Sequence, residues 1–133
     1  MKLIICTDEN NGMLFNNRRQ SRDSVLCRYI LNTVGEHPLA MTEYSAKIFP
    51  ESENIVVCDN IFECGNCFCF AEEAVPSLAG VEELYWFNWN RSYPADVVFN
   101  HNVENLGFRL EKTVEFAGSS HDKITLNLYK KGE

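Results

Sequence analysis

Residues 2–12 read KLIICTDENNG, a short apolar run that changes abruptly into a polar one. The run from Leu3 to Cys6 has no polar alternation, which predicts a strand covered on both faces at the centre of a sheet. Asp8 to Gly12 bond their own backbone or tolerate positive φ, so they predict a loop. Loops that leave central strands commonly carry the chemistry of α/β proteins. The segment from Gly12 to Asp23 is therefore the first candidate site.

The composition predicts one globular domain over residues 1–133. Hydrophobic residues make up 45% and charged residues 23%, so the chain can bury a core and is not of a disordered type. The formal net charge of −7 disfavours nucleic acids and anionic membranes as partners. No apolar run approaches the roughly 20 residues of a membrane span, and the stretch from Met1 has neither the h-region nor the cleavage site of a signal peptide, so none is expected. A cytoplasmic protein with six reduced cysteines is expected.

The spacing of apolar residues predicts an α/β fold with a mostly parallel central sheet and an antiparallel C-terminal hairpin. Leu26, Tyr29, Ile30 and Thr33 follow helical spacing, and Gly35 ends that helix. Strict alternation in 108–116 and 124–128 predicts the hairpin, with Phe108, Leu110, Val114 and Phe116 on one face of its first strand. Further strands are expected at 39–41, 54–58, 66–70, 83–90 and 95–99, a brief helix at 44–47 and a short helical piece at 72–79.

This order of elements resembles dihydrofolate reductase over most of the chain. The strand Leu3 to Thr7 with its loop Asp8 to Gly12 is similar to the family's first strand and the start of its mobile substrate loop. Asp23 lies near the place of the family's active-site carboxylate. The resemblance implies a three-layer sandwich. Its other matching stretches are Pro38–Met41, Asn54–Val57, Leu84–Tyr85, Ala95–Phe99 and Phe108–Lys130.

The motifs that hold cofactor and folate in that family differ here. Asn17-Arg18-Arg19 stands where the resemblance implies Leu-Pro-Trp, and Thr42-Glu43-Tyr44-Ser45 stands in place of the phosphate-binding Gly-Arg-x-Thr. Ser52 replaces the arginine for the folate carboxylate, and Phe87 replaces a threonine beside the active-site carboxylate. The chain has no Gly-Gly for the pyrophosphate helix. Because phosphates need helix N-termini and cations, these losses predict no bound cofactor.

Two functions follow from this pattern. The first is a binding or interaction protein that has lost NADPH and folate reductase activity and takes an unknown small molecule. Its candidate ligand-binding residues are Gly12, Met13, Phe15, Asn17, Arg18, Arg19 and Phe87. The alternative is an NADPH-dependent reductase of a pterin-like or other small heterocycle, with Asp23 as proton donor and Thr42, Glu43, Tyr44 and Ser45 as degenerate cofactor positions. Self-association through a free sheet edge, giving a homodimer, remains open.

Plainer interpretations compete with each candidate. Asp23 also suits the N-cap of the first helix. The basic cluster of Arg18, Arg19 and Arg22 could receive an anionic group or could pair with Asp8, Glu9 or Asp23. The run Ser119-Ser120-His121-Asp122 contains the residue types of a hydrolase triad, but neighbours in sequence cannot form one, so a hairpin turn is expected.

The cysteines and the aromatic residues favour a core. Cys64-Gly65-Asn66-Cys67 is a single CxxC motif without a second pair or spaced histidines, so no metal site is expected. Cys67 and Cys69 fall on one face of a strand with Phe68 and Phe70 on the other. The stripe Tyr85, Trp86, Phe87 and Trp89 could form the floor of a flat-ligand pocket but is more typical of a buried strand.

Overall fold

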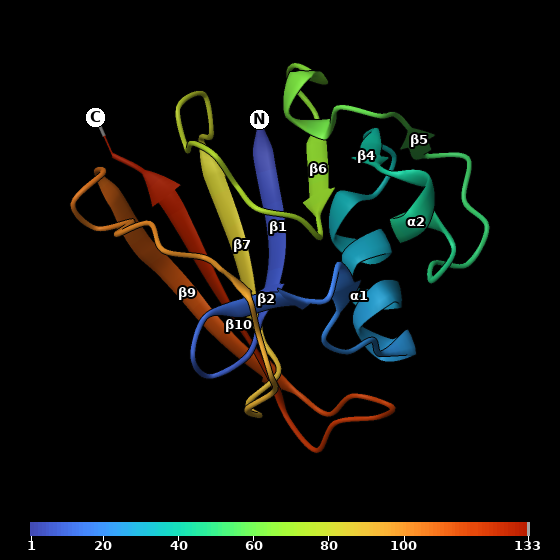
Figure 1. The fold of residues 1–133 in the computed structure, drawn as a ribbon. Coiled ribbons are helices and arrows are strands. Elements are labelled where there is room, and N and C mark those ends of the chain that lie inside the picture. The colour runs from blue at the N-terminus through green and yellow to red at the C-terminus, as the bar shows by residue number, and fades with distance from the viewer. Residues whose placement is uncertain (133) are drawn as a thin grey trace.

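A computed structural model describes residues 1–132 and shows a seven-stranded sheet in the order β5-β4-β6-β1-β7-β10-β9 (Figure 1). The first strand, β1 (Lys2–Thr7), lies at its centre, as its unbroken apolar run predicts. The remaining strands of this sheet are β4 (Leu39–Met41), β5 (Ile55–Val57), β6 (Phe68–Ala71), β7 (Glu83–Asn88), β9 (Phe108–Phe116) and β10 (Ile124–Lys131).

Strand directions agree with the predicted fold. The pairs β1–β6, β1–β7, β4–β5 and β4–β6 are parallel, whereas β10 runs antiparallel to both β7 and β9. The carboxyl ends of the five parallel strands therefore meet at one edge, where loops begin at Asp8, Thr42, Cys58, Glu72 and Trp89. Ligand sites of open α/β sheets usually lie at this edge.

The helix α1 (Ser24–Val34) covers one face of the sheet. Its buried residues Leu26, Cys27, Ile30 and Val34 pack into a core with side chains of β1, β6 and β7. The same face carries α2 (Glu43–Ala46), a single turn capped by the side chain of Thr42. Gly35, with a φ of 59°, ends α1 as predicted.

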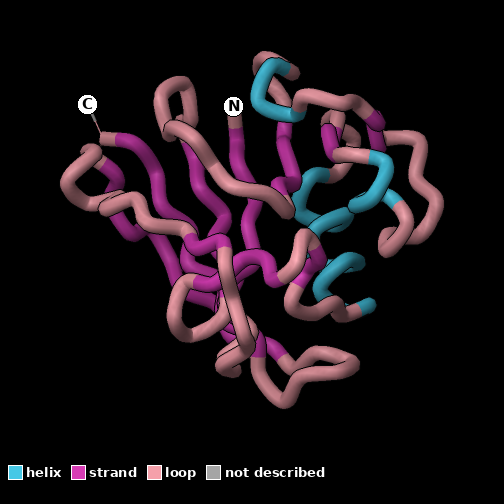
Figure 2. Tube along the Cα trace, viewed as in Figure 1, coloured by secondary structure: helices cyan, strands magenta, loops and turns pink. Residues whose placement is uncertain are grey.

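Loops and a small second sheet cover the other face (Figure 2). This sheet has the order β3-β2-β8, built from β2 (Gly12–Phe15), β3 (Arg18–Arg19) and β8 (Val97–Val98). A second core lies between this small sheet and the central sheet. The 3₁₀ helix η1 (Ile61–Glu63) contributes Ile61 to that core. The three layers are thus helices, central sheet and a mixed layer of strands and loops. None of the described helices has the length and apolar character that crossing a membrane requires.

Two predictions about elements were wrong. Residues 72–79 form no helix but an irregular segment that buries Val75 and Leu78, because Pro76 removes a backbone donor and disfavours the helical conformation of the residue before it. The apolar residues of β9 do not share one face. A bulge opposite Leu128 and Tyr129 shifts the register, so Phe108 joins one core, Val114 and Phe116 pack on the other, and Leu110 is 53% exposed.

Candidate functional site

Asp23 caps α1 and also accepts hydrogen bonds from the turn before β10. Its Oδ1 accepts from the backbone N–H groups of Val25 and Leu26 at 2.9 and 3.2 Å. The same oxygen accepts from the backbone N–H of Ser119 at 2.9 Å and its hydroxyl at 3.1 Å, while Oδ2 accepts from the N–H of Ser120 at 2.7 Å. The plainer interpretation of Asp23 as an N-cap is therefore confirmed.

The turn reaches Asp23 because it contains a glycine at the closest approach. A Cβ added to Gly118 would lie 2.8 Å from the Asp23 Cγ and 2.9 Å from the Ile124 Cδ1. Any other residue there would push the turn away from the carboxylate.

The Asp23 carboxylate is ionised at neutral pH. Burial alone would raise its pKa, but the hydrogen bonds from His121 and from the backbone N–H groups of Ser119, Ser120 and Leu26 outweigh burial. The net effect holds the pKa of Asp23 well below its ordinary value. A carboxylate in this state is a hydrogen-bond acceptor and an anionic partner, and it holds no proton to donate.

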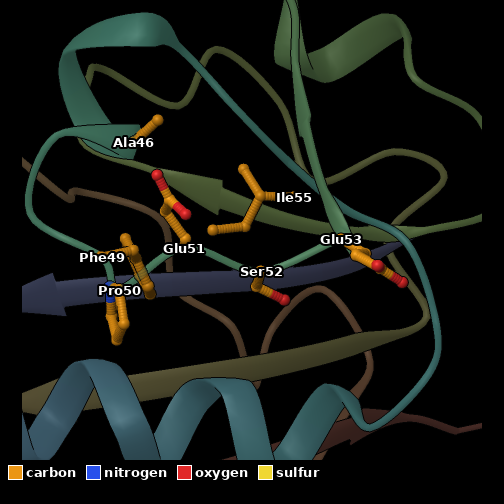
Figure 3. A pocket seen from close by; sticks show the side chains of 7 residues that line it. All are labelled: Ala46, Phe49, Pro50, Glu51, Ser52, Glu53 and Ile55. Carbon is orange, nitrogen blue, oxygen red and sulfur yellow. The ribbon is translucent and has the colours of Figure 1, made fainter.

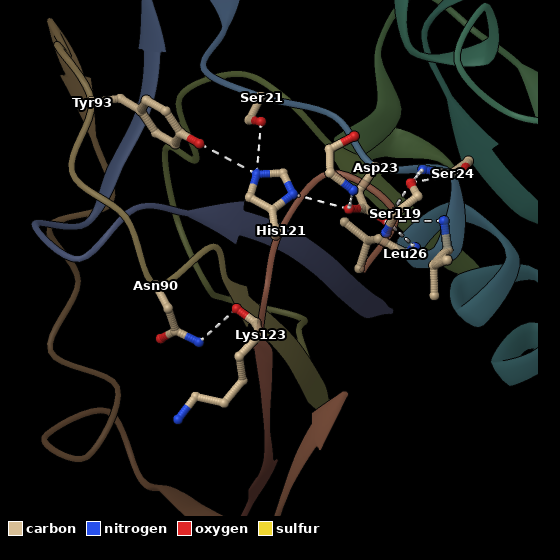
Figure 4. Close-up of polar contacts among 11 residues, drawn as sticks. Ser21, Asp23, Ser24, Leu26, Asn90, Tyr93, Ser119, His121 and Lys123 are labelled. Atoms are coloured by element: carbon tan, nitrogen blue, oxygen red, sulfur yellow. Dashed lines mark hydrogen bonds and ion pairs between the residues drawn. The ribbon is translucent and has the colours of Figure 1, made fainter. Parts of the chain in front are cut away.

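His121 is buried against Asp23 and joins it to a serine (Figure 4). Its Nδ1 lies 3.0 Å from the Asp23 Oδ2, and its Nε2 lies 2.9 Å from the Ser21 Oγ and 3.3 Å from the Tyr93 hydroxyl. The ring stacks on Trp89 at 4.5 Å between centroids. The sequence run 119–122 is thus a turn, as expected, yet its histidine meets a serine and an aspartate from the far end of the chain.

Asp8 orders the loop that follows β1. Its carboxylate accepts from the backbone N–H groups of Asn10 and Gly12, from the backbone N–H of Tyr93 and from the Gln20 amide. Burial opposes the charge, but these donors lower the pKa of Asp8. The loop is therefore fixed to the segment that carries Tyr93.

The side chain of Arg19 lies at the carboxyl ends of β4 and β6. Its guanidinium forms a bidentate pair with Glu72, with Nε to Oε2 at 2.8 Å and Nη2 to Oε1 at 2.9 Å. It also lies 4.0 Å from the ring centroid of Tyr44 and donates to the Tyr44 carbonyl. The Ser45 hydroxyl donates to Glu72 at 2.8 Å. Of the degenerate cofactor positions, Tyr44 thus contacts Arg19, and Ser45 contacts Glu72 and Thr42.

A cavity of about 490 Å³ lies next to these residues. It contains three of the predicted ligand-binding or basic positions, and Tyr93 connects it to His121. Arg18 is exposed and has no ion-pair partner among residues 1–132. The lining residues are Phe15, Asn16, Arg18, Arg19, Gln20, Tyr93 and Pro94.

The other predicted ligand-binding residues lie outside this cavity. Met13 and Phe87 are buried in the two cores, where Phe87 packs edge-on against Tyr29 and Phe116. Gly12 is buried under Gln20 and the side chain of Ala95. Asn17 is exposed, at a φ of 60° in the turn between β2 and β3. None of these four residues lines the cavity, so their positions do not support a direct contact with a ligand bound there.

A second cavity, of about 570 Å³, lies between α2 and β5 (Figure 3). It includes Ser52, the position for which the resemblance implies a folate-binding arginine. Glu51 and Glu53 flank that serine, so the cavity disfavours a carboxylate ligand. The other residues that line it are Ala46, Phe49, Pro50 and Ile55.

The CxxC cysteines lie beside each other at the start of β6. The Cys67 thiol donates to the Cys64 Sγ at 2.6 Å, and burial with this contact raises the pKa of Cys67 to about 12. Cys69 is buried in the core. Within residues 1–132 no group of three or more histidines, cysteines or carboxylates is arranged to hold a metal ion.

Sequence reasoning missed Tyr93 and Glu72 and assigned His121 only to a turn. His121 and Asp23 are 98 positions apart, and Arg19 and Glu72 are 53 apart. No local spacing rule connects residues at such separations. Only the order of the strands in the folded sheet brings both pairs to one edge, and that order cannot be read from local sequence patterns.

Comparison with known proteins supports the architecture. No protein-family model and no curated protein sequence matches the chain. Among solved structures, the dihydrofolate reductase from Enterococcus faecalis complexed with NADP(H) and RAB-propyl superposes with a TM-score of 0.69. The alignment covers 99% of this chain and 96% of that one at 9% sequence identity. The chain has a dihydrofolate reductase-like fold. At 9% identity this similarity shows the architecture alone.

Proposed function

We propose that this chain is a small-ligand-binding protein that uses a dihydrofolate reductase-like fold without reducing folate through NADPH. The Arg19–Glu72 pair carries the proposal. With Tyr44 and Ser45 it occupies the carboxyl ends of β4 and β6. The resemblance implies that cofactor phosphates would bind after β4.

The charges at this position support the loss of a nicotinamide cofactor. Arg19, the cation that contacts this segment through Tyr44, is already paired with Glu72, and Glu43 adds a second carboxylate. A pyrophosphate would have to displace a bidentate, largely buried ion pair and would face both anions. The single turn of α2 offers few free N–H groups in exchange.

The cavity beside Arg18 supports a small anionic ligand with an aromatic or other flat face. Its volume of about 490 Å³ lies within the usual range for small-molecule sites. The exposed guanidinium of Arg18 can receive a carboxylate in bidentate fashion, and Phe15, which is 42% exposed, offers an apolar surface. Both groups belong to the hairpin β2–β3, so one rigid element presents them together.

The reductase alternative requires Asp23 to protonate a substrate. Its carboxylate accepts hydrogen bonds on both oxygens and has a lowered pKa, which favours the ionised form. The alternative therefore needs a rearrangement that frees and protonates Asp23 when substrate binds.

Titration of NADPH, dihydrofolate and a series of small aromatic carboxylates, followed by tryptophan fluorescence and thermal shift, tests the proposal. We expect no response to NADPH or dihydrofolate and binding of an aromatic carboxylate that weakens about tenfold or more in Arg18→Ala. Arg28→Ala, which removes an exposed arginine from α1, is the matched control and leaves binding unchanged. Micromolar binding of NADPH, lost in Asp23→Asn, would instead support the reductase.

A further inference from the structure

Ser21, His121 and Asp23 are connected in the order and geometry of a nucleophile, a base and an orienting acid (Figure 4). The Ser21 Oγ lies 2.9 Å from His121 Nε2, and the opposite ring nitrogen lies 3.0 Å from the Asp23 Oδ2. We propose that Ser21 is a catalytic nucleophile and that this site hydrolyses small carboxylic esters.

The protonation of the site follows from Asp23. An ionised carboxylate can only accept, so the neutral His121 ring carries its proton on Nδ1 and presents a lone pair on Nε2. The Ser21 hydroxyl must then donate to Nε2, which is the arrangement that activates a serine. The Tyr93 hydroxyl, at 3.3 Å, is the longer of the two contacts to this nitrogen.

The surroundings stabilise the imidazolium that forms when Ser21 gives up its proton. Asp23 faces the ring with a full negative charge, held in place by backbone donors from α1 and from the turn before β10. The stacked indole of Trp89 offers a π face to the cation. Because these groups are fixed by the fold, little reorganisation accompanies proton transfer.

The nucleophile is the accessible member of the set. Asp23 and His121 are 2% and 4% exposed, whereas Ser21 is intermediate in exposure. Its neighbour Gln20 lines the 490 Å³ cavity, and Arg22 lines another of about 270 Å³. No hydrogen bond within residues 1–132 has the backbone N–H of Ser21 or Arg22 as its donor, and the proposal assigns these two groups to the carbonyl oxygen that becomes an oxyanion.

The reaction balances with water as the only co-reactant. Ser21 Oγ bonds to the ester carbonyl carbon as its proton moves to His121 Nε2, and the C–O bond to the alcohol breaks as that proton passes to the leaving oxygen. Water then adds to the acyl-serine, gives a proton to Nε2 and releases the acid as Ser21 recovers its hydrogen. The substrate class rests on the proposed function, since the cavity beside Arg18 would hold an ester that carries an anionic group.

The test is covalent labelling of the wild-type protein with a fluorophosphonate, with the modified residue located by mass spectrometry. We expect one adduct, on Ser21, and hydrolysis of p-nitrophenyl acetate with an acetyl-Ser21 intermediate. Ser21→Ala lowers the hydrolysis rate on the order of 10²-fold or more and abolishes labelling. Ser77→Ala, an exposed serine in another loop, changes neither.

Absence of labelling, or labelling at another serine with equal speed, overturns the inference. A Ser21→Ala protein that melts at a lower temperature yet hydrolyses the ester at the wild-type rate also overturns it, because the triad would then be structural only. Labelling of Ser21 in the Arg18→Ala variant separates the two proposals, since the nucleophile is independent of the arginine. Labelled Ser21 without aromatic carboxylate binding would contradict the proposed ligand class alone.

Discussion

Asp23 shows how one side chain can join the two ends of a chain. It satisfies orphan N–H groups at the start of α1 and backbone donors of the turn at Ser119 and Ser120. Buried charges are tolerated only where donors compensate for lost water. Here the donors are so numerous that the folded state favours the ionised carboxylate, despite burial.

Removing the Asp23 charge is expected to destabilise the fold in a pH-dependent way. Asp23→Asn should lower the free energy of unfolding by about 2–4 kcal/mol at neutral pH, since charge-assisted hydrogen bonds are lost in a buried site. The folded pKa is lowered, so the stabilisation is complete above the ordinary aspartate value of about 4 and is lost as pH falls below it. Urea unfolding from about pH 6 to about pH 3 measures both effects.

Asp8→Asn is the control variant, because Asp8 also has a lowered pKa but holds the loop after β1 and not the turn before β10. The difference in unfolding free energy between wild type and Asp23→Asn should shrink as the pH falls through this window. A constant difference from neutral to acid pH would contradict the assignment of the charge.

At the scale of elements, the Arg19–Glu72 pair fixes β3 to the end of β6. Both side chains are largely buried, with exposed fractions of 16% and 10%. Tyr44 stacks on the guanidinium, and the Ser45 hydroxyl donates to the carboxylate, so these contacts also hold α2 to β3 and β6. Three short elements, each too small to be stable alone, are held together by polar contacts.

A double-mutant cycle should show this coupling. Arg19→Met and Glu72→Gln are each expected to destabilise the protein, with an interaction energy of about 1–3 kcal/mol between them. Chemical denaturation of the four proteins gives the value. An interaction energy near zero would mean that solvent screens the pair as it does an exposed one.

At the scale of the whole molecule, the two edges of the central sheet differ. The β9 edge carries exposed charges at Arg109, Glu111, Lys112 and Glu115 and contains a bulge, features that discourage pairing with another chain. The β5 edge is short and exposes Val56 and Val57 at 48% and 53%. If two copies associate through a sheet edge, the β5 edge is the suitable one.

We expect concentration-dependent dimerisation through β5. Light scattering coupled to size-exclusion chromatography should give a mass that rises with protein concentration for wild type and stays monomeric for Val57→Lys. Leu110→Lys places the same charge on the β9 edge and should leave dimerisation unchanged. A monomer at all concentrations would remove self-association from the functions of this fold.

Several elements were predictable because their information is local. The uniform apolar run of β1 and the alternation of β7 and β10 set the buried faces through the period of the strand itself. Leu84 and Trp86 do pack on the opposite side from Tyr85 and Phe87. The β9 bulge was not predictable, because it arises from the register against β10 and not from the β9 sequence.

The sequence by itself determined the class of fold, since periodic burial and helix caps act over a few residues and specify each element in isolation. Only the tertiary structure decided which polar groups meet. The strand order brings Asp23 to His121 and Arg19 to Glu72. It places segments that are far apart in the sequence, and with them all four residues, at one edge of the sheet. Whether a carboxylate there is a free acid or a compensated anion depends on donors from distant segments, because pKa follows local solvation and neighbours.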